Sequence, residues 1–147
     1  MIALLQRVSQ ASVTIPPQQI IGQIGKGLLV MIGIEKTDTQ ATADRLLQRF
    51  LNYRVFSDSN DKMNLSLLDI QGDLLLVPQF TLPADTRKGN RPSFSPSASS
   101  QIAEPLFEYL LTQARIAPLT VEAGKFAADM QVSLINDGPV TFWLHSH

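Results

Sequence analysis

Two short stretches of the chain contain the residue types that could do chemistry. Residues 78–82 place the amide of Gln79 and the hydroxyl of Thr81 two positions apart, so on an extended strand both side chains lie on one face. Pro78 has no backbone N–H, which predicts a strand edge or a bulge, where neighbouring N–H groups are free to meet a ligand. An ordinary strand with a polar face is the alternative interpretation.

The second stretch, residues 136–141, contains Asn136, Gly138, Pro139 and Thr141. An Asp-Gly pair favours a hairpin turn, so a turn without a chemical role is the simplest interpretation. The sequence does not predict a cis bond before Pro139, because only ~5–6% of X-Pro bonds are cis. These residues by themselves leave the role of the stretch open.

Composition excludes or disfavours several kinds of site. The chain has no cysteine, so it can form neither a disulfide, nor a thiolate nucleophile, nor a cysteine-ligated metal site. Its two histidines, His145 and His147, lie among the last three residues, where chains fray, which disfavours a catalytic triad or a histidine metal site. Asp58 and Asp61 lack EF-hand spacing, and residues 25–27 lack phosphate-loop spacing and predict a hairpin turn instead. We expect no metal and no cofactor.

Size and charge limit the class of protein. With 147 residues, 44% of them apolar and 17% charged, the chain is expected to form one globular domain spanning residues 1–147. The net charge of −1 argues against a long grip on a phosphate backbone, so any nucleic-acid contact should be local. The N-terminus lacks the charge order of a signal peptide, and the longest apolar run, residues 28–34, is too short to cross a bilayer. We therefore expect a soluble cytoplasmic protein with neither a membrane nor DNA as its partner.

A fold rich in strands must position these residues. Short β-branched runs between turn residues predict strands at 3–8, 11–15, 20–24, 28–34, 67–70, 73–82, 130–134 and 140–144. Apolar spacing predicts one helix after the cap candidates at 37–39 and a second from Ser99 or Ser100. Pro105 should kink the second helix unless that helix begins later. The expected fold class is α+β, with a curved, barrel-like, mainly antiparallel sheet and about two helices.

Together the two stretches resemble the D-aminoacyl-tRNA deacylase family, and the likeness runs along the whole chain. Seven parts of the family pattern occur in the same order, at residues 6–13, 53–56 with 62–65, 79–82, 84–86, 91–94, 126–132 and 136–143. Each part alone is a weak signal, but seven in the right order argue strongly against chance similarity.

The resemblance implies a homodimer that acts on tRNA. Each subunit of the family inserts a Gly-cis-Pro pair into its partner's site, where the two backbones form a wall around the α-carbon of the amino acid. Carried over, that pair is Gly138 and Pro139, within a motif that also contains Asn136 and Thr141. The catalytic strand of the family falls on Gln79, Phe80 and Thr81.

One position departs from the family pattern, because the family usually has serine where this chain has Pro78. A related group that acts on L-alanyl esters has proline there, but it has alanine in place of Phe80 and lacks the intact Asn-x-Gly-Pro-x-Thr motif. A D-specific deacylase is therefore the favoured interpretation, and an L-alanyl-tRNA deacylase is the alternative. Two non-catalytic alternatives also stay open: a tRNA-binding dimer inactivated at Pro78, and a structural dimer whose polar strand is merely solvated.

The resemblance also implies that the RNA supplies the reactive group. The hydroxyl next to the ester on the terminal ribose already lies beside the carbonyl, and such proximity can be worth ~7–11 kcal/mol. The protein would then fix the ester and stabilise the oxyanion with a backbone N–H, expected at Phe80. Direct attack by Thr81 is the alternative, but no base is expected beside it.

Two expectations concern substrate choice and tRNA binding. A rigid obstacle on the L side of the α-carbon should admit many D-amino acids, and it should also admit achiral glycyl-tRNA. Arg87, Lys88 and Arg91 follow the catalytic strand closely, which suits contacts with phosphates at the 3′ end of the tRNA. A solvated basic loop is the equal alternative.

Overall fold

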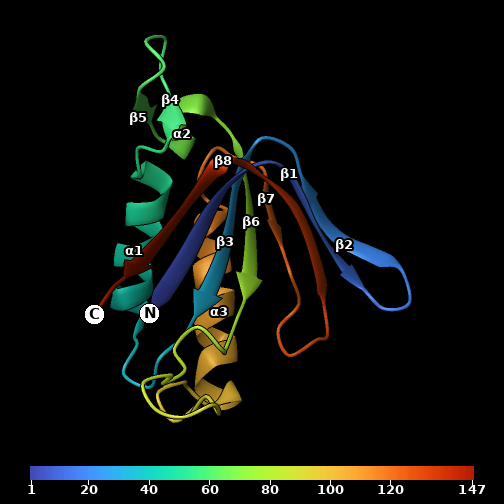
Figure 1. Ribbon diagram of the computed structural model, residues 1–147, viewed down its shortest axis with the longest axis vertical. Coiled ribbons are helices and arrows are strands. Elements are labelled where there is room, and N and C mark those ends of the chain that lie inside the picture. The colour runs from blue at the N-terminus through green and yellow to red at the C-terminus, as the bar shows by residue number, and fades with distance from the viewer.

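The computed structural model describes residues 1–147. Eleven elements follow one another along the chain: β1 (Ile2–Ile15), β2 (Gln19–Ile24), β3 (Gly27–Gly33), α1 (Gln40–Asn52), β4 (Phe56–Ser57), β5 (Met63–Leu65), α2 (Leu67–Ile70), β6 (Asp73–Pro78), α3 (Ser100–Ala114), β7 (Val121–Ala123) and β8 (Gln131–His145). Six strands form one strongly curved sheet, with α3 behind it and α1 beside it (Figure 1). The barrel-like α+β prediction is confirmed.

The long strand β1 lies between two antiparallel neighbours. β8 pairs with it along nearly its full length, and β3 and β2 follow one another along its other edge. β6 and β7 then extend the sheet with parallel pairing, so the sheet is mixed, although antiparallel pairs still predominate. The parallel part arises because α1 and α3 provide the crossover connections that parallel neighbours require.

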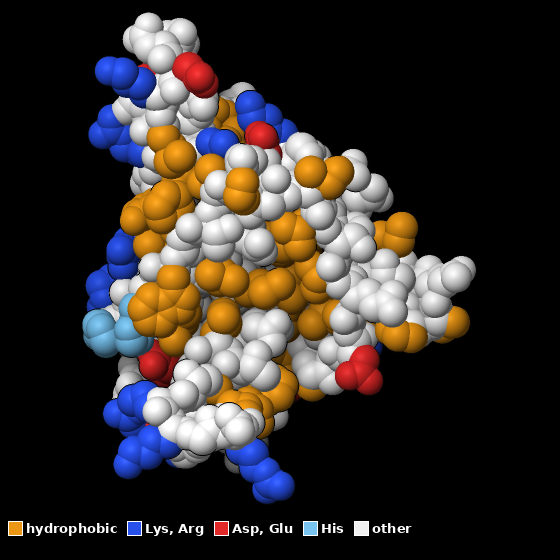
Figure 2. All heavy atoms as spheres, viewed as in Figure 1, with side chains coloured by type: hydrophobic (Ala, Val, Ile, Leu, Met, Phe, Trp, Pro, Cys, Tyr) orange, Lys and Arg blue, Asp and Glu red, His pale blue; other side chains and the backbone are white.

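The two faces of the sheet bury different sets of apolar side chains. The larger cluster, of 24 buried residues, fills the space between the sheet and the helices and includes Leu28, Phe50 and Phe107. A cluster of seven, including Leu29 and Leu75, lies on the opposite face, as expected from the two-residue period of strands. No helix covers that second face, and Figure 2 shows apolar side chains gathered at its centre.

Two local predictions were wrong. Residues 67–70 form a helix instead of a strand, so there are three helices and not two, because Ser66 accepts from Asp69 N while Asp69 accepts from Ser66 N. Residues 25–27 are a bend between β2 and β3 and not a hairpin turn, since both strands continue along β1 in one register. Gly27 is required there, because a Cβ would lie 1.8 Å from the Asp73 carbonyl oxygen.

The helix starts agree with the caps named from sequence. Thr39 caps α1, and Ser99 is the N-cap residue of α3, which contains Pro105. None of the helices is long and apolar enough to cross a membrane.

Candidate functional site

The first stretch lies where β6 leaves the sheet. Pro78 is the last residue of β6 and pairs with Ile32 of β3, and Gln79 N donates to the Ile32 carbonyl at 2.7 Å. On the other side, β7 ends at Ala123, opposite Leu76, before it reaches Pro78. Pro78 therefore stands at an edge, as its missing N–H predicts. The predicted strand to residue 82 was too long, because a turn begins directly after Pro78.

This turn fixes three successive peptide groups through their carbonyl oxygens. Leu82 N donates to the Gln79 carbonyl at 3.3 Å, and Ala84 N donates to the Thr81 carbonyl at 3.1 Å. Between them, Ser97 Oγ donates to the Phe80 carbonyl at 2.9 Å. The N–H groups of Phe80 and Thr81 have no acceptor in the chain. Two adjacent, fixed and unpaired N–H donors are suited to bind an anionic oxygen.

The side chains of the turn are also ordered. Gln79 Nε2 donates to Thr81 Oγ1 at 2.5 Å, which brings amide and hydroxyl together as the spacing predicted, although the backbone is a turn and not a strand. The Phe80 ring is 62% exposed and packs on Phe94, with 5.3 Å between ring centroids. Sequence reasoning missed Ser97, and it assigned no role to Phe94 although the family likeness included residues 91–94. Both residues lie in a loop whose contact with Phe80 depends on the tertiary fold.

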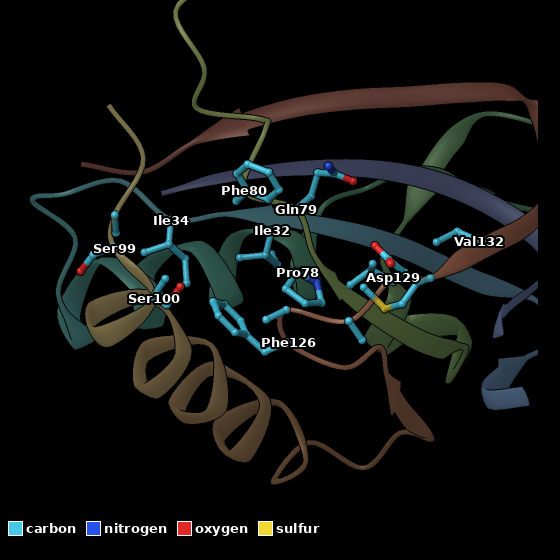
Figure 3. Close-up of a pocket in the computed structure, with 16 residues that line it drawn as sticks. Ile32, Ile34, Pro78, Gln79, Phe80, Ser99, Ser100, Phe126, Asp129 and Val132 are labelled. Carbon is cyan, nitrogen blue, oxygen red and sulfur yellow. The ribbon is translucent and has the colours of Figure 1, made fainter. Parts of the chain in front are cut away.

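A cleft of about 600 Å³ opens beside this turn. Eleven of its sixteen lining residues are hydrophobic. Figure 3 shows Ser99 and Ser100 at one end, Asp129 and Val132 at the other, and Gln79 and Phe80 along one rim. The floor contains Ile32, Pro78 and Phe126. The cleft therefore combines apolar walls with a polar rim that includes the free donors.

The second stretch forms a bulge inside β8. Thr141 pairs with Gln6 and Asn136 pairs with Val8, so residues 137–140 of β8 lie opposite Arg7 alone. The predicted hairpin turn was wrong, because the chain continues in the same direction. The peptide bond between Gly138 and Pro139 is cis, as the resemblance implied.

Asn136 closes the bulge. Val140 N donates to Asn136 Oδ1 at 2.7 Å, and Asn136 Nδ2 donates to Thr141 Oγ1 at 2.9 Å. Gly138 has φ +147° and is exposed, as is Pro139, so the tip of the bulge projects from the surface. The structure thus brings the four motif residues together.

Arg7 supports the bulge from β1. Its Nε donates to the Asp137 carbonyl at 2.8 Å, and one terminal nitrogen donates to the Val55 carbonyl at 2.7 Å. Only 14% of the Arg7 side chain is exposed. The family likeness included Arg7, but no role was predicted for it, because its contacts join segments 48 and 130 residues away.

The bulge and the cleft of one protomer lie apart. None of residues 136–141 lines the cleft. Arg7 lies opposite the bulge and pairs with Leu28 of β3, and Leu28 pairs with Leu74 of β6. The turn of the cleft begins after Pro78, four residues further along β6. Standard sheet spacings give about 13 Å along the strands and about 14 Å across them. The two halves of the predicted site therefore do not meet within one chain.

The basic loop after the turn is only partly available to a ligand. The side chain of Arg87 donates to both carboxyl oxygens of Asp85, at 2.9 and 2.7 Å. These hydrogen bonds lower the pKa of Asp85 to about 2. Lys88 and Arg91 are exposed and form no ion pair. Arg87 is thus neutralised, whereas its two neighbours carry free charge.

The C-terminal histidines are not on a frayed tail, contrary to expectation. His145 belongs to β8, and its Nε2 lies 2.6 Å from Glu35 Oε2. Burial of Glu35 raises the pKa of its carboxyl, but hydrogen bonds from the Met1 ammonium and from His145 outweigh burial and leave that pKa below its ordinary value. These groups tie the chain ends together outside the cleft.

Comparisons with known proteins decide the family. A family model described as D-Tyr-tRNA(Tyr) deacylase matches residues 4–145. The chain is 60% identical over 145 residues to a D-aminoacyl-tRNA deacylase of Haemophilus influenzae (strain 86-028NP), covering 99% of both chains. It is 58% identical over 139 residues to a D-aminoacyl-tRNA deacylase of Pseudoalteromonas translucida (strain TAC 125), covering 95% of both. The chain belongs to the D-aminoacyl-tRNA deacylase family.

Solved structures agree with the fold. One, titled c-Myc DNA Unwinding Element Binding Protein, has a TM-score of 0.94 and 41% identity and covers 100% of this chain and 99% of its own. A probable eukaryotic D-amino acid tRNA deacylase, with a TM-score of 0.85 at 18% identity and 97% of both chains covered, shows the same fold. As a member of the deacylase family, the chain is a tRNA-editing hydrolase, as the sequence predicted.

Proposed function

We propose that the chain cleaves D-aminoacyl-tRNA by stabilising an oxyanion while the tRNA's own vicinal hydroxyl attacks the ester. The pair of free N–H groups at Phe80 and Thr81 is the observation that carries this proposal. Because hydrogen bonds already hold the three neighbouring carbonyls, these donors need little reorganisation when charge develops. The vicinal oxygen forms a bond to the acyl carbon, the original ester bond breaks, and the proton of the attacking hydroxyl passes to the ribose oxygen that leaves. Water then adds to the acyl carbon of the new ester, whose ribose oxygen leaves with a proton, so the free amino acid and the intact ribose diol are released.

Direct attack by Thr81 is the weaker alternative. Its hydroxyl oxygen already accepts from Gln79 Nε2, and an amide cannot take a proton from it. Both histidines lie in the terminal cluster with Glu35 and are absent from the cleft lining.

The cleft is proposed to hold the aminoacylated end of the tRNA. Its volume of about 600 Å³ falls within the ~300–1,000 Å³ typical of small-molecule sites. Apolar walls with Phe126 suit a nucleobase, and Gln79 with the free N–H groups at the rim suits the ester. No cofactor or metal is needed for this chemistry.

A homodimer is proposed to complete the site. Gly138 and Pro139 cannot reach the cleft of their own protomer across the separation described above, but an exposed, braced bulge can enter a partner's cleft. The uncovered sheet face with apolar side chains at its centre supports such an association (Figure 2).

Exclusion by this bulge would supply the selectivity. A ten-thousandfold preference for D over L corresponds to ~5.5 kcal/mol. A pocket that merely fits a side chain gains only ~1–3 kcal/mol per methylene-sized difference. A rigid backbone on the L side achieves more by repulsion, and it leaves glycyl-tRNA as a substrate.

The remaining predictions form part of the same proposal. Lys88 and Arg91 are proposed to contact phosphates at the 3′ end, with Arg87 contributing less because Asp85 neutralises it. We propose that residues 1–147 act as one domain, in the cytoplasm, where aminoacyl-tRNA is used, and not on DNA.

A deacylation assay tests this function. Purified protein is incubated with D-tyrosyl-, L-tyrosyl-, glycyl- and L-alanyl-tRNA, and with D-tyrosyl-tRNA whose terminal 2′-hydroxyl is removed. We expect cleavage of the D-tyrosyl and glycyl substrates only. Rapid cleavage of the deoxy substrate would contradict RNA assistance, and cleavage of L-alanyl-tRNA alone would favour the related specificity. Binding without cleavage would identify an inactive tRNA-binding dimer.

A further inference from the structure

The exposed side of α1 carries two arginines, Arg45 and Arg49, and one carboxylate, Asp44. Arg45, Gln48, Arg49 and Asn52 lie three and four positions apart, which places them along one side of the helix. The Tyr109 hydroxyl of α3 donates to the carboxylate of Asp44, the one acid in α1, with its oxygen 2.9 and 3.1 Å from the two carboxylate oxygens. Neither arginine of α1 forms an ion pair with an acidic side chain. The two arginines of α1 therefore have no acidic side chain as a direct partner.

More free cations flank this helix. Lys36 precedes α1, Arg54 follows it, and both are exposed and without ion pairs. We call Lys36, Arg45, Arg49 and Arg54 the cationic edge. Figure 2 shows Lys and Arg side chains lining the edge of the molecule that Figure 1 shows to be formed by α1 and the β4–β5 hairpin. Cationic side chains thus gather at this edge although the net charge of the chain is −1.

The cationic edge is connected to the turn that follows Pro78. Lys36 N donates to the Pro96 carbonyl at 3.2 Å, in the loop that also supplies Ser97 to the Phe80 peptide. At the other side, Arg49 donates to the His145 carbonyl at 2.9 Å, and Arg45 donates to the His147 carbonyl oxygen. Arg49 is thus held at the surface by a neutral carbonyl that leaves its charge uncompensated, whereas Arg45 contacts an oxygen of the terminal carboxylate of His147, which compensates part of its charge.

We propose that the cationic edge binds the phosphate backbone of the acceptor stem of tRNA. This inference rests on the proposed function, which places the aminoacylated 3′ end in the cleft. A stem leaving the cleft past residues 88–91 would meet Lys36 first and then the face of α1. At 1.5 Å per residue, Arg45 and Arg49 lie about 6 Å apart along α1. Lys36 before the helix and Arg54 after it extend this line of cations, so it offers several phosphates a partner.

The test adds negative charge without removing any of the arginine contacts. The double variant Ala41→Glu with Gln48→Glu places carboxylates beside Arg45, at exposed positions without side-chain hydrogen bonds. The matched control, Gln18→Glu with Gln19→Glu, makes the same charge change at the β1–β2 turn on the far side of the molecule. A second pair, Lys36→Gln against Lys26→Gln, removes one cation from the cationic edge and one from the bend between β2 and β3.

Three measurements are made on each variant. They are kcat and KM for D-tyrosyl-tRNA at low and high salt, the same constants for 3′-O-D-tyrosyl-adenosine, and filter binding of uncharged tRNA. We expect the α1 double variant to raise KM and Kd for tRNA about fivefold or more at low salt, with the difference closing at high salt. Lys36→Gln should lower the salt slope of binding by about 1. The adenosine ester, which has no stem, should be cleaved as before.

Equal effects of the α1 variant and its control would overturn the inference, as would unchanged tRNA binding or an equal loss on the adenosine ester. Failure of the proposed function gives a different result, since the unaltered protein would then cleave neither ester. Filter binding of uncharged tRNA decides the inference in that case too, because it does not depend on catalysis.

Discussion

A single hydrogen bond orients the peptide group between Phe80 and Thr81, which carries one of the two proposed oxyanion donors. Its carbonyl is held by Ser97 Oγ, so the Thr81 N–H of the same peptide points to the opposite side, as a trans peptide requires. We therefore propose Ser97 as a positioning residue, whose hydroxyl orients the Thr81 N–H by holding the Phe80 carbonyl.

Replacing this hydroxyl should slow catalysis without weakening binding. We expect Ser97→Ala to lower kcat for D-tyrosyl-tRNA about tenfold with KM little changed, because the donor is misaligned and not removed. Ser97→Thr, which keeps the hydroxyl, should restore most of the rate. A rise in KM at unchanged kcat, or failure of threonine to rescue, would contradict the positioning role.

Asp85 offers a test of the basic loop by pH. Its pKa in the folded chain is about 2, below its ordinary value of 3.8, so the pair with Arg87 stabilises the loop fully above about pH 4. That contribution is lost as the pH falls through about 2. We expect Arg87→Gln to return the pKa of Asp85 toward 3.8 in an NMR titration of its carboxyl carbon, whereas Lys88→Gln should leave it unchanged. An Asp85 pKa that stays low in Arg87→Gln would show another cause.

The bulge of β8 is the element that carries the proposed selectivity. Asn136 holds both the Val140 N–H and the Thr141 hydroxyl, so its truncation should free the tip without changing the oxyanion donors. We expect Asn136→Ala to raise cleavage of L-tyrosyl-tRNA at least about tenfold while the D rate changes less. Asn60→Ala, in the exposed β4–β5 loop, is the matched control. An unchanged ratio of D to L rates in Asn136→Ala would exclude the bulge as the selective element.

The whole molecule decides whether the two halves of the site ever meet. Within one chain they lie on different strands and at different levels of the sheet, so the proposed activity requires two chains. We expect light scattering to give twice the 16.2 kDa mass of the chain and stereoselectivity to fall on dilution below the dimer dissociation constant. A monomer with full selectivity at every concentration would refute the requirement for a partner.

The sequence by itself determined the local features and the family. Alternating apolar residues predicted most strands, Thr39 and Ser99 predicted the helix starts, and the ordered motifs indicated the deacylase family, which the comparisons confirmed. These features depend on neighbours within a few positions, or on patterns that can be read along the chain. The same local rules gave the wrong result at residues 67–70, where the capping pair Ser66 and Asp69 was overlooked.

Tertiary structure alone decided how these parts serve a site. The Asp-Gly pair predicted a turn, but β8 pairs with β1 on both sides of this stretch and keeps its direction, so residues 137–140 form a bulge braced by Arg7. β6 turns where its neighbour β7 has already ended. Ser97 reaches the Phe80 carbonyl of this turn only because the loop that contains Ser97 folds back onto it. Such contacts join residues far apart in the chain, and their geometry is determined by the packing of the whole sheet, which no local pattern encodes.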